Sequence, residues 1–291
     1  MNRLLGLAAA ALWLAPAMAR ADDPAPAPPP DKSGYTVFNP VPDDQLRSLC
    51  TDRPTKSTSP CTVDAGHWQV ESDLYNYTEQ SSDGVTTTTQ LFTNPTLKLG
   101  LTNNLDFEVN IAPYEQASTH DKASGVTTTS GGVGDLFLKA KLNLLGDDGG
   151  SVAFALEPYV KVPTAPLGVG NGAVEEGILA PIQVSLPANW QLVIDPEYDE
   201  LANAIGHGQH SNISGLLSFG YPVTKTITVS LEVWGDANFD PSGEVKQASI
   251  DLGAAWIPAK APNFQLDGGV NLGLNRATPG AQAYLGVSRR F

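Results

Sequence analysis

The sequence is short of charged residues and of cysteine. Lys, Arg, Asp and Glu make up 16% of the 291 residues, against about 25% in ordinary soluble domains. The net charge of −14 excludes a nucleic-acid partner, because such partners bind basic surfaces. Two cysteines are too few for a disulfide-stapled miniprotein or a zinc cluster. After residue 20 no run reaches the ~18 apolar residues of a membrane helix. These absences leave an exported, β-rich chain.

Residues 1–21 have the three parts of a secretory signal peptide. Arg3 is the basic part, residues 4–14 form the apolar core, and Ala19-Arg20-Ala21 is a cleavage site of small residues. Cleavage after Ala19 and a short membrane anchor are the alternatives. We expect export through a cleaved signal.

Residues 22–65 are expected to form a Pro-rich periplasmic segment. The run PAPAPPP favours extended polyproline II, and the first half of the segment is too poor in apolar residues to fold alone. Cys50 and Cys61 are predicted to form a disulfide in the oxidising compartment. A redox or metal role for them is the alternative, but no CxxC or His-rich cluster supports it.

Residues 66–291 alternate apolar and polar side chains, as in Leu105-Asp106-Phe107-Glu108-Val109. This period of two predicts strands with one apolar face. Most predicted strands reach the ~9–11 residues that a tilted strand needs to cross a bilayer. We therefore predict an all-β fold, a transmembrane antiparallel up-and-down β-barrel of about 12 strands. The predicted strands are 67–79, 86–101, 104–115, 132–145, 150–163, 175–187, 189–201, 211–222, 225–237, 246–257, 263–275 and 281–291.

The links between these strands alternate in length. The links of one set are short. The links of the other set are mostly longer, apart from the compact first one at 80–85; the rest are 116–131, 164–174, 202–210, 238–245 and 276–280. Outer-membrane barrels combine short periplasmic turns with longer external loops, and an even strand count places both chain ends in the periplasm. The chain ends in a strand at Phe291, which resembles the terminal signal that the barrel-assembly machinery reads. Localisation in the Gram-negative outer membrane follows, with lipid as a partner.

If the apolar faces meet lipid, the polar faces line the lumen. An acidic lumen of this kind concentrates cations and repels anions. Such a barrel is either open to small solutes or filled by its own side chains, and twelve strands lie between these cases. The lumen-lining candidates are Glu71, Asp73, Lys98, Asp106, Glu108, Asp135, Lys139, Lys141, Glu157, Lys161, Asp195, Glu197, Asp199, Glu232, Asp236, Asp251, Asp267 and Arg290.

A set of short motifs precedes the alternating strands: Thr51-Asp52-Arg53-Pro54, Ser59-Pro60, Gly66, Gln69 and Glu71, followed by long strands and Phe291. With this ordered set, residues 51–291 resemble a family of predicted outer-membrane transporters named for the meta-pathway of phenol degradation. Cys61 departs from the family pattern. The resemblance implies a barrel channel for small solutes, aromatic or hydrophobic compounds among them.

Other functions find little support. No nucleotide or zinc-protease motif is present, and the four histidines (His67, His120, His207 and His210) fall at strand ends or in loops, away from a strand serine. We expect no enzyme activity, no catalytic residue, no cofactor and no metal. A divalent cation at residues 195–200, or a metal at His207 and His210, is the weaker alternative to plain polarity. The alternatives to a passive small-solute channel are a structural or adhesive barrel and a soluble β-sandwich that binds a ligand.

Overall fold

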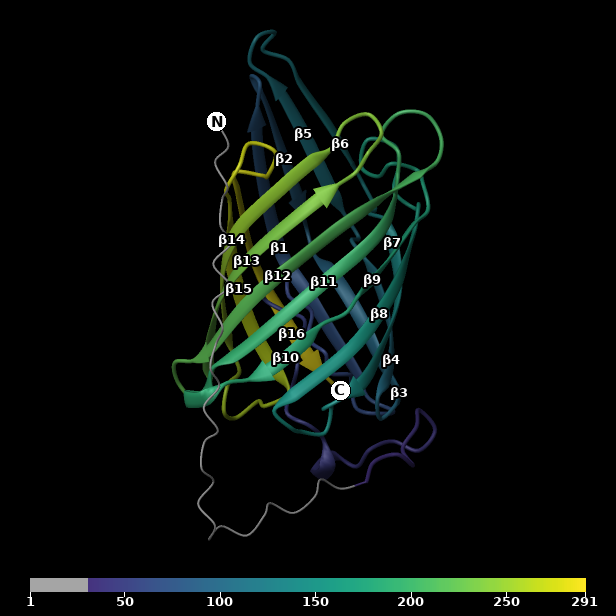
Figure 1. The fold of residues 1–291 in the computed structure, drawn as a ribbon, viewed down its shortest axis with the longest axis vertical. Coiled ribbons are helices and arrows are strands. Elements are labelled where there is room, and N and C mark those ends of the chain that lie inside the picture. The colour runs from purple at the N-terminus through teal and green to yellow at the C-terminus, as the bar shows by residue number, and fades with distance from the viewer. Residues whose placement is uncertain (1–30) are drawn as a thin grey trace, which may run out of the picture. The chain divides into compact units, whose positions relative to one another are not determined.

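The structure is a computed structural model that describes residues 31–291; the signal peptide expected at 1–21 lies outside them. Within these residues, sixteen strands form one closed antiparallel sheet (Figure 1). The same residues contain no helix that is long and apolar enough to cross a membrane. The strands are β1 (Trp68–Ser82), β2 (Val85–Leu91), β3 (Asn94–Thr102), β4 (Leu105–Ile111), β5 (Glu115–Asp121), β6 (Thr127–Gly132), β7 (Leu136–Leu145), β8 (Val152–Val162), β9 (Glu175–Leu179), β10 (Ile182–Ser185), β11 (Gln191–Ala202), β12 (Gln209–Pro222), β13 (Ile227–Asn238), β14 (Val245–Trp256), β15 (Phe264–Gly273) and β16 (Ala281–Arg290). Two short 3-10 helices are η1 (Asp43–Gln45) and η2 (Pro187–Asn189).

The sixteen strands cross the barrel wall twelve times, because four crossings are interrupted. β2 continues as β3, β4 as β5, β6 as β7, and β9 as β10, after breaks of two or three residues. β16 pairs with β1 from Gln69–Arg290 to Glu79–Ala281. This pairing closes the sheet, so that no strand edge is left with unpaired backbone groups in lipid. The predicted twelve-stranded barrel is confirmed.

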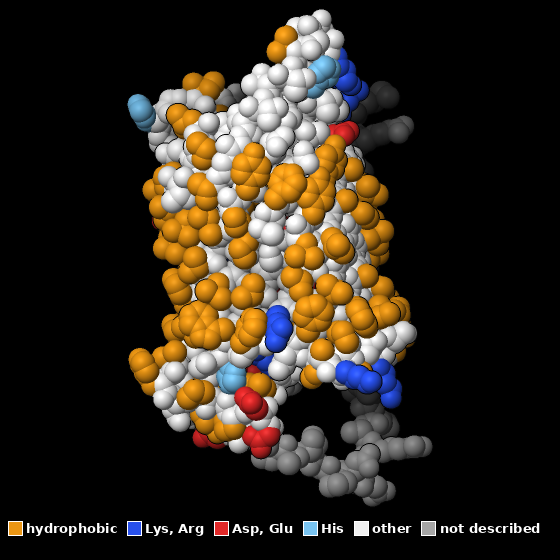
Figure 2. Space-filling view, turned by 180° about the vertical axis from the view of Figure 1, so that it is seen from behind, with side chains coloured by type: hydrophobic (Ala, Val, Ile, Leu, Met, Phe, Trp, Pro, Cys, Tyr) orange, Lys and Arg blue, Asp and Glu red, His pale blue; other side chains and the backbone are white. Residues whose placement is uncertain are grey.

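Burial in this fold is the reverse of that in a soluble protein. On β4, Asp106 and Glu108 are each 1% exposed, whereas Phe107 between them is 39% exposed. Lys141, Glu108, Glu157 and Glu232 are among the largest fully buried side chains of the described residues. Apolar side chains of the wall strands are exposed, and they form a broad band across the face that Figure 2 shows. A soluble sandwich would bury the apolar face, so this alternative is wrong.

The two ends of the barrel differ. At the end that we call the terminal end, β1 begins and β16 ends side by side: the Phe291 N–H donates to the Trp68 carbonyl at 2.8 Å. The turns at this end have two residues at 103–104, after β3, and at most seven, at 257–263 after β14. The opposite end, the loop end, carries residues 163–174, 203–208, 239–244 and 274–280. As predicted, both ends of the barrel sequence lie on one side, which in an outer-membrane barrel is the periplasmic side.

One predicted loop has a different structure. Residues 116–131 were expected as a long external loop, but β5 and β6 pair there from Glu115–Gly132 to His120–Thr127. The hairpin, together with the paired ends of β1 and β2 beside it, extends past the other strands at the loop end (Figure 1). Its threonines have a high strand propensity, and the nearby Gly and Ser residues concealed this in the sequence.

Aromatic side chains surround the wall near both ends. Trp68, Trp190 and Trp256, at strand starts or ends of the terminal end, are each 43–44% exposed. Tyr114, towards the loop end, is 45% exposed, and its ring stacks 5.9 Å from that of Phe92. Amphipathic rings at these levels are typical of membrane–water interfaces.

Candidate functional site: a loop inserted in the lumen

The eighteen lumen-lining candidates all lie on the inner side of the alternation, and none has an exposed side chain. Four are half-buried, namely Asp135, Lys139, Glu197 and Asp236. The other fourteen are buried: Glu71, Asp73, Lys98, Asp106, Glu108, Lys141, Glu157, Lys161, Asp195, Asp199, Glu232, Asp251, Asp267 and Arg290.

Much of this burial is due to the chain itself. Residues 50–61, which we call the inserted loop, enter the lumen from the terminal end and contact β1, β3, β7, β11, β13, β14 and β15. A disulfide between Cys50 and Cys61 closes the loop. Residues 22–65 were expected as one periplasmic segment, and the described part of it divides in two. Residues 31–49 lie against the terminal end, where the Val37 N–H donates to the Leu101 carbonyl at 2.8 Å, and residues 50–61 lie inside the barrel.

Arg53 of the inserted loop spans three neighbouring strands. Gly286 of β16 pairs with Asp73 of β1 on one side and with Asp267 of β15 on the other. The Arg53 guanidinium donates to Asp73 Oδ1 at 2.7 Å and to Asp267 Oδ1 at 2.8 Å. It lies over Gly286, where a Cβ would stand 1.8 Å from the guanidinium. The acid–glycine–acid row therefore forms a seat for one arginine.

Asp52 forms the second anchor, on the adjoining part of the wall formed by β1, β3 and β7. Its carboxylate accepts from Lys141 Nζ at 2.7 Å and forms a short ion pair with Lys98. The Asp52 N–H donates to Glu71 Oε2 at 2.9 Å. Lys141 also pairs with Glu157 at 3.0 Å, so a carboxylate from the loop completes a buried charge network of the wall.

The carboxylates of Asp52, Glu108 and Glu157 converge closely enough to hold a metal ion. Lys141 Nζ lies 2.7, 3.5 and 3.0 Å from their oxygens. An ammonium group therefore stands among these carboxylates and offsets part of their negative charge.

The rest of the loop binds the acidic residues of β11, β13 and β14. Lys56 Nζ donates to Asp251 at 2.9 Å and lies 4.6 Å from the centroid of the Trp234 ring. The Lys56 N–H donates to Glu232 at 3.0 Å, and the Thr58 N–H donates to Asp195 at 2.8 Å. Backbone donors thus satisfy carboxylates that have no Lys or Arg partner among the described residues.

Polar cavities lie on both sides of the inserted loop. On the loop side, a cavity of about 410 Å³ is bounded by Asp52, Lys56 and Thr58 and by the wall residues Asn110 and Lys139. On the terminal side, cavities of about 330 and 380 Å³ reach Cys50 and Ser59. The loop is thus the partition between two water-accessible parts of the lumen.

Several predicted residues lie apart from the inserted loop, towards the loop end. Lys161 Nζ pairs with Glu175 at 2.6 Å and with Asp135 at 3.5 Å. The Tyr159 hydroxyl donates to Asp199 at 2.7 Å, and Glu197 accepts from Ser214 at 3.1 Å. These groups line the lumen on the loop side of the partition.

The structure does not bring together the residues of either weaker metal hypothesis, those at 195–200 or the pair His207 and His210. In residues 195–200, Asp195 is bound to Thr58 inside the lumen, while Glu200 hydrogen-bonds the outward Tyr198 hydroxyl. His210 is buried, with Nδ1 3.1 Å from Asn203 Oδ1, and His207 is exposed.

Asp240 joins two loops at the loop end. Its carboxylate accepts from the Ala204 and Ser242 N–H groups, each at 2.7 Å. Hydrogen bonds from the Ser242 side chain and from the Ala204 and Ser242 N–H groups lower the pKa of Asp240 to about 2. A depressed carboxyl pKa stabilises the folded state above the unfolded value of about 3.9, and this contribution is lost as pH falls through the folded value.

We therefore expect the protection factor of the Ala204 amide in hydrogen exchange to hold between pH 7 and 4 and to fall between pH 4 and 2. The Thr278 amide is an internal control, because it donates to the Asn275 side-chain oxygen, which does not titrate. Equal losses at Ala204 and Thr278 would contradict the assignment to Asp240.

Residues Asp52, Arg53 and Lys56 were not among the predicted site residues. The signal that could have found them was the Thr51-Asp52-Arg53-Pro54 motif, which sequence reasoning used only to recognise the family. No sequence pattern marks Gly286 as a site residue, because a glycine on the inner face does not disturb the alternation of apolar and polar residues.

Comparisons with known proteins agree with this architecture. The COG4313 outer membrane channel from Pseudomonas putida F1 is similar in structure, with a TM-score of 0.61 and 16% identity over 77% of this chain and 95% of that chain. The beta domain of the Bordetella autotransporter BrkA has a TM-score of 0.49 and 12% identity over 77% and 99%. No curated protein matches the sequence. The fold is that of an outer-membrane β-barrel, as predicted. The family described as "Putative MetA-pathway of phenol degradation" matches residues 51–291, and the chain belongs to this family.

Proposed function

We propose that the protein is a passive outer-membrane channel for small solutes, with the inserted loop as the constriction of its path. The observation that carries this proposal is the polar, charge-lined lumen, which is wide enough to hold a whole loop and still has cavities of about 330–410 Å³ on both sides of it. The family description supports small aromatic compounds as the solutes.

The lumen charges support a preference for cations. Each of the seven bases of the lumen and the inserted loop has an acidic partner: Arg53, Lys56, Lys98, Lys139, Lys141, Lys161 and Arg290. Six lumen acids have no Lys or Arg partner among the described residues: Asp106, Asp195, Glu197, Asp199, Glu232 and Asp236. An excess of negative charge attracts cations and repels anions in a narrow polar path.

Single-channel recording in a planar bilayer with a salt gradient tests the proposal. We expect a small current with a cation-favouring reversal potential. Glu197→Gln removes an unpaired lumen charge and should lower the cation-to-anion permeability ratio by roughly a factor of two. Glu200→Gln is the matched control, because this acid faces outward beside Tyr198, and the ratio should not change. Absence of current from both the wild type and a variant with a released loop would overturn the channel.

No catalytic chemistry is proposed. Within residues 31–291, no histidine ring hydrogen-bonds a serine hydroxyl: His67 binds the Val41 and Phe291 carbonyls, and His120 binds Thr127. Phe291 is 60% exposed at the end of β16, which suits our proposal that the barrel-assembly machinery reads it. For the outer wall, we propose that the apolar band contacts the lipid of the outer membrane.

A further inference from the structure

The charged anchors of the constriction lie between the two cysteines. Asp52, Arg53, Lys56 and Thr58, which bind the wall, belong to the ring that Cys50 and Cys61 close. The disulfide stands at the base of this ring, on the side of the terminal end. This covalent bond therefore limits the conformational freedom of the segment that carries these anchors.

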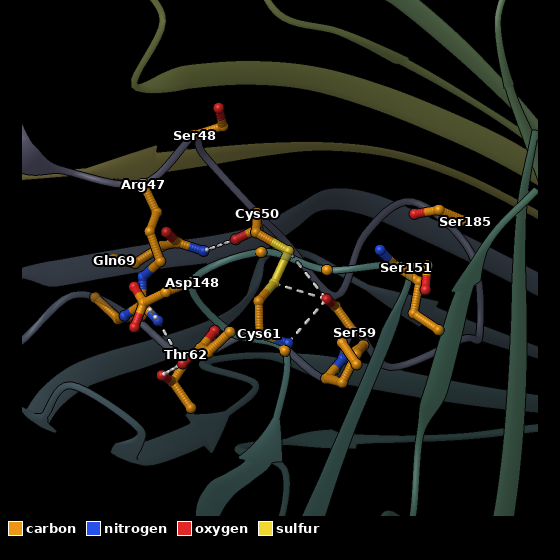
Figure 3. A pocket seen from close by; sticks show the side chains of 18 of the residues that line it. Arg47, Ser48, Cys50, Ser59, Cys61, Thr62, Gln69, Asp148, Ser151 and Ser185 are labelled. Carbon is orange, nitrogen blue, oxygen red and sulfur yellow. Dashed lines mark hydrogen bonds and ion pairs between the residues drawn. A yellow bond between two sulfur atoms is a disulfide. The ribbon is translucent and has the colours of Figure 1, made fainter. Parts of the chain in front are cut away.

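The disulfide can be reached from the terminal end. Cys50 and Cys61 are half-buried, and both line the cavity of about 330 Å³ that lies on that side of the inserted loop. In Figure 3 the disulfide lies at the centre of this pocket, with Arg47 and Asp148 to one side and Ser151 and Ser185 to the other.

The surroundings of the sulfur atoms favour thiol–disulfide exchange. The Ser59 hydroxyl lies 2.9 Å from Cys50 Sγ and 2.7 Å from Cys61 Sγ. It can donate a hydrogen bond to the sulfur that leaves as a thiolate. Arg47 and Arg290 line the same cavity, but they pair with Asp147 and Asp64, so the Ser59 hydroxyl is the group that can stabilise the leaving sulfur.

We propose that Cys50–Cys61 is a site of thiol–disulfide exchange that sets how firmly the inserted loop closes the channel. The partner is a dithiol protein of the periplasm, which approaches the terminal end. This inference rests on the proposed function, because it assigns a regulator to the same constriction.

The exchange balances without any further co-reactant. A thiolate of the partner attacks one sulfur atom, forms a mixed disulfide and releases the other cysteine as a thiolate. The second thiol of the partner resolves the mixed disulfide. Cys50 and Cys61 together gain two electrons and two protons, and the partner's dithiol is oxidised to a disulfide.

The consequence for the channel follows from chain entropy. In the oxidised protein the ring is already closed when the loop is outside its seat, so that docking costs little conformational entropy. In the reduced protein the undocked segment is free, and docking must order it. For a ring of this size the undocked state gains about 10- to 100-fold in population.

Solute flux measured with and without a reductant tests the proposal. Full-length mature protein is reconstituted in liposomes, and the swelling rate in a small neutral sugar is recorded before and after dithiothreitol. Alkylation and mass spectrometry of the same sample report the state of the two cysteines. We expect reduction to raise the rate at least about tenfold. Cys50→Ser/Cys61→Ser should have the high rate throughout and no response to dithiothreitol, with a heat-modifiable band as proof of folding.

Two results would overturn the inference. One is complete reduction with an unchanged swelling rate. The other is a disulfide that dithiothreitol cannot reduce in the folded barrel. A separate variant, Arg53→Ala/Lys56→Ala, removes loop anchors without any change in the cysteines. If the Arg53→Ala/Lys56→Ala protein lets the sugar pass but reduction of the wild type has no effect, only the redox inference fails. If the sugar passes through neither this variant, nor the Cys50→Ser/Cys61→Ser variant, nor the reduced protein, the proposed channel fails.

Discussion

Arg53→Ala should raise solute flux by about 30- to 100-fold. The substitution leaves Asp73 and Asp267 facing each other across Gly286 without the guanidinium that joins them. Loss of one partner from a buried ion pair costs about 3–5 kcal/mol in a dry site. We expect about 2–3 kcal/mol here, because water enters the lumen once the loop leaves, and each 1.4 kcal/mol is a factor of ten in the docking equilibrium. Liposome swelling with a small sugar measures the change.

Arg289→Ala is the matched control for this prediction. Arg289 is the neighbour of the lumen residue Arg290, but its side chain is exposed and lies 4.8 Å from the Phe291 ring. The swelling rate of this variant should equal that of the wild type. An Arg53→Ala protein that folds and swells at the wild-type rate would show that the inserted loop does not limit passage.

Gly286→Ala should reproduce most of the Arg53→Ala effect from the other side of the contact. The new Cβ would stand 1.8 Å from one guanidinium nitrogen and 2.3 Å from the Arg53 Cζ atom. Two carboxylates hold this guanidinium, so it cannot move aside without loss of its hydrogen bonds. We expect the swelling rate to rise by roughly tenfold, since such losses typically cost about 1–3 kcal/mol.

The double variant separates this mechanism from a general loss of stability. Once Arg53 is alanine, the Cβ at residue 286 meets no guanidinium, so Gly286→Ala should add nothing further. Gly220→Ala is the control, because it adds a Cβ whose nearest neighbour is 3.7 Å away at Gln191. Additive effects of Arg53→Ala and Gly286→Ala would contradict the proposed seat.

The barrel could be predicted from the sequence because its main signal is local. Asp106, Phe107 and Glu108 alternate in the sequence as they alternate between lumen and lipid in the wall, so a window of a few residues shows both the strand and its faces. The strand ends were harder to place: β5 and β6 are rich in Ser, Thr and Gly, residues that also build loops.

The content of the lumen could not be predicted in this way. Asp52 lies 46 positions from Lys98 and 89 from Lys141, and no local pattern joins positions so far apart. The sequence pattern therefore indicates the inner acids but not the loop residues that bind them. Sequence reasoning left open whether the lumen was open or filled by its own wall side chains. In the structure the lumen instead holds an inserted segment, residues 50–61, which ion pairs join to the wall.

The arrangement also explains why charges line the inside of this barrel so densely. A dry apolar interior would bind a loop permanently, whereas charged groups are solvated when the loop leaves and satisfied when it returns. Asp73, Asp267 and Asp251 each face a cation of the inserted loop. Water can take the place of each of these partners, so the same wall can stabilise both the docked and the undocked loop of our proposal.

The most direct test of the central claim is to fix the inserted loop to the wall. A Cβ at Gly253 of β14 would stand 2.6 Å from Thr55 Cγ2 and 2.8 Å from Pro54 Cγ. After a small shift of the loop, Thr55→Cys and Gly253→Cys in the Cys50→Ser/Cys61→Ser background should join the loop to the strand by a disulfide. The account predicts no single-channel current above the lipid baseline while the link is oxidised, and a large current after reduction. The same current in both states would contradict it.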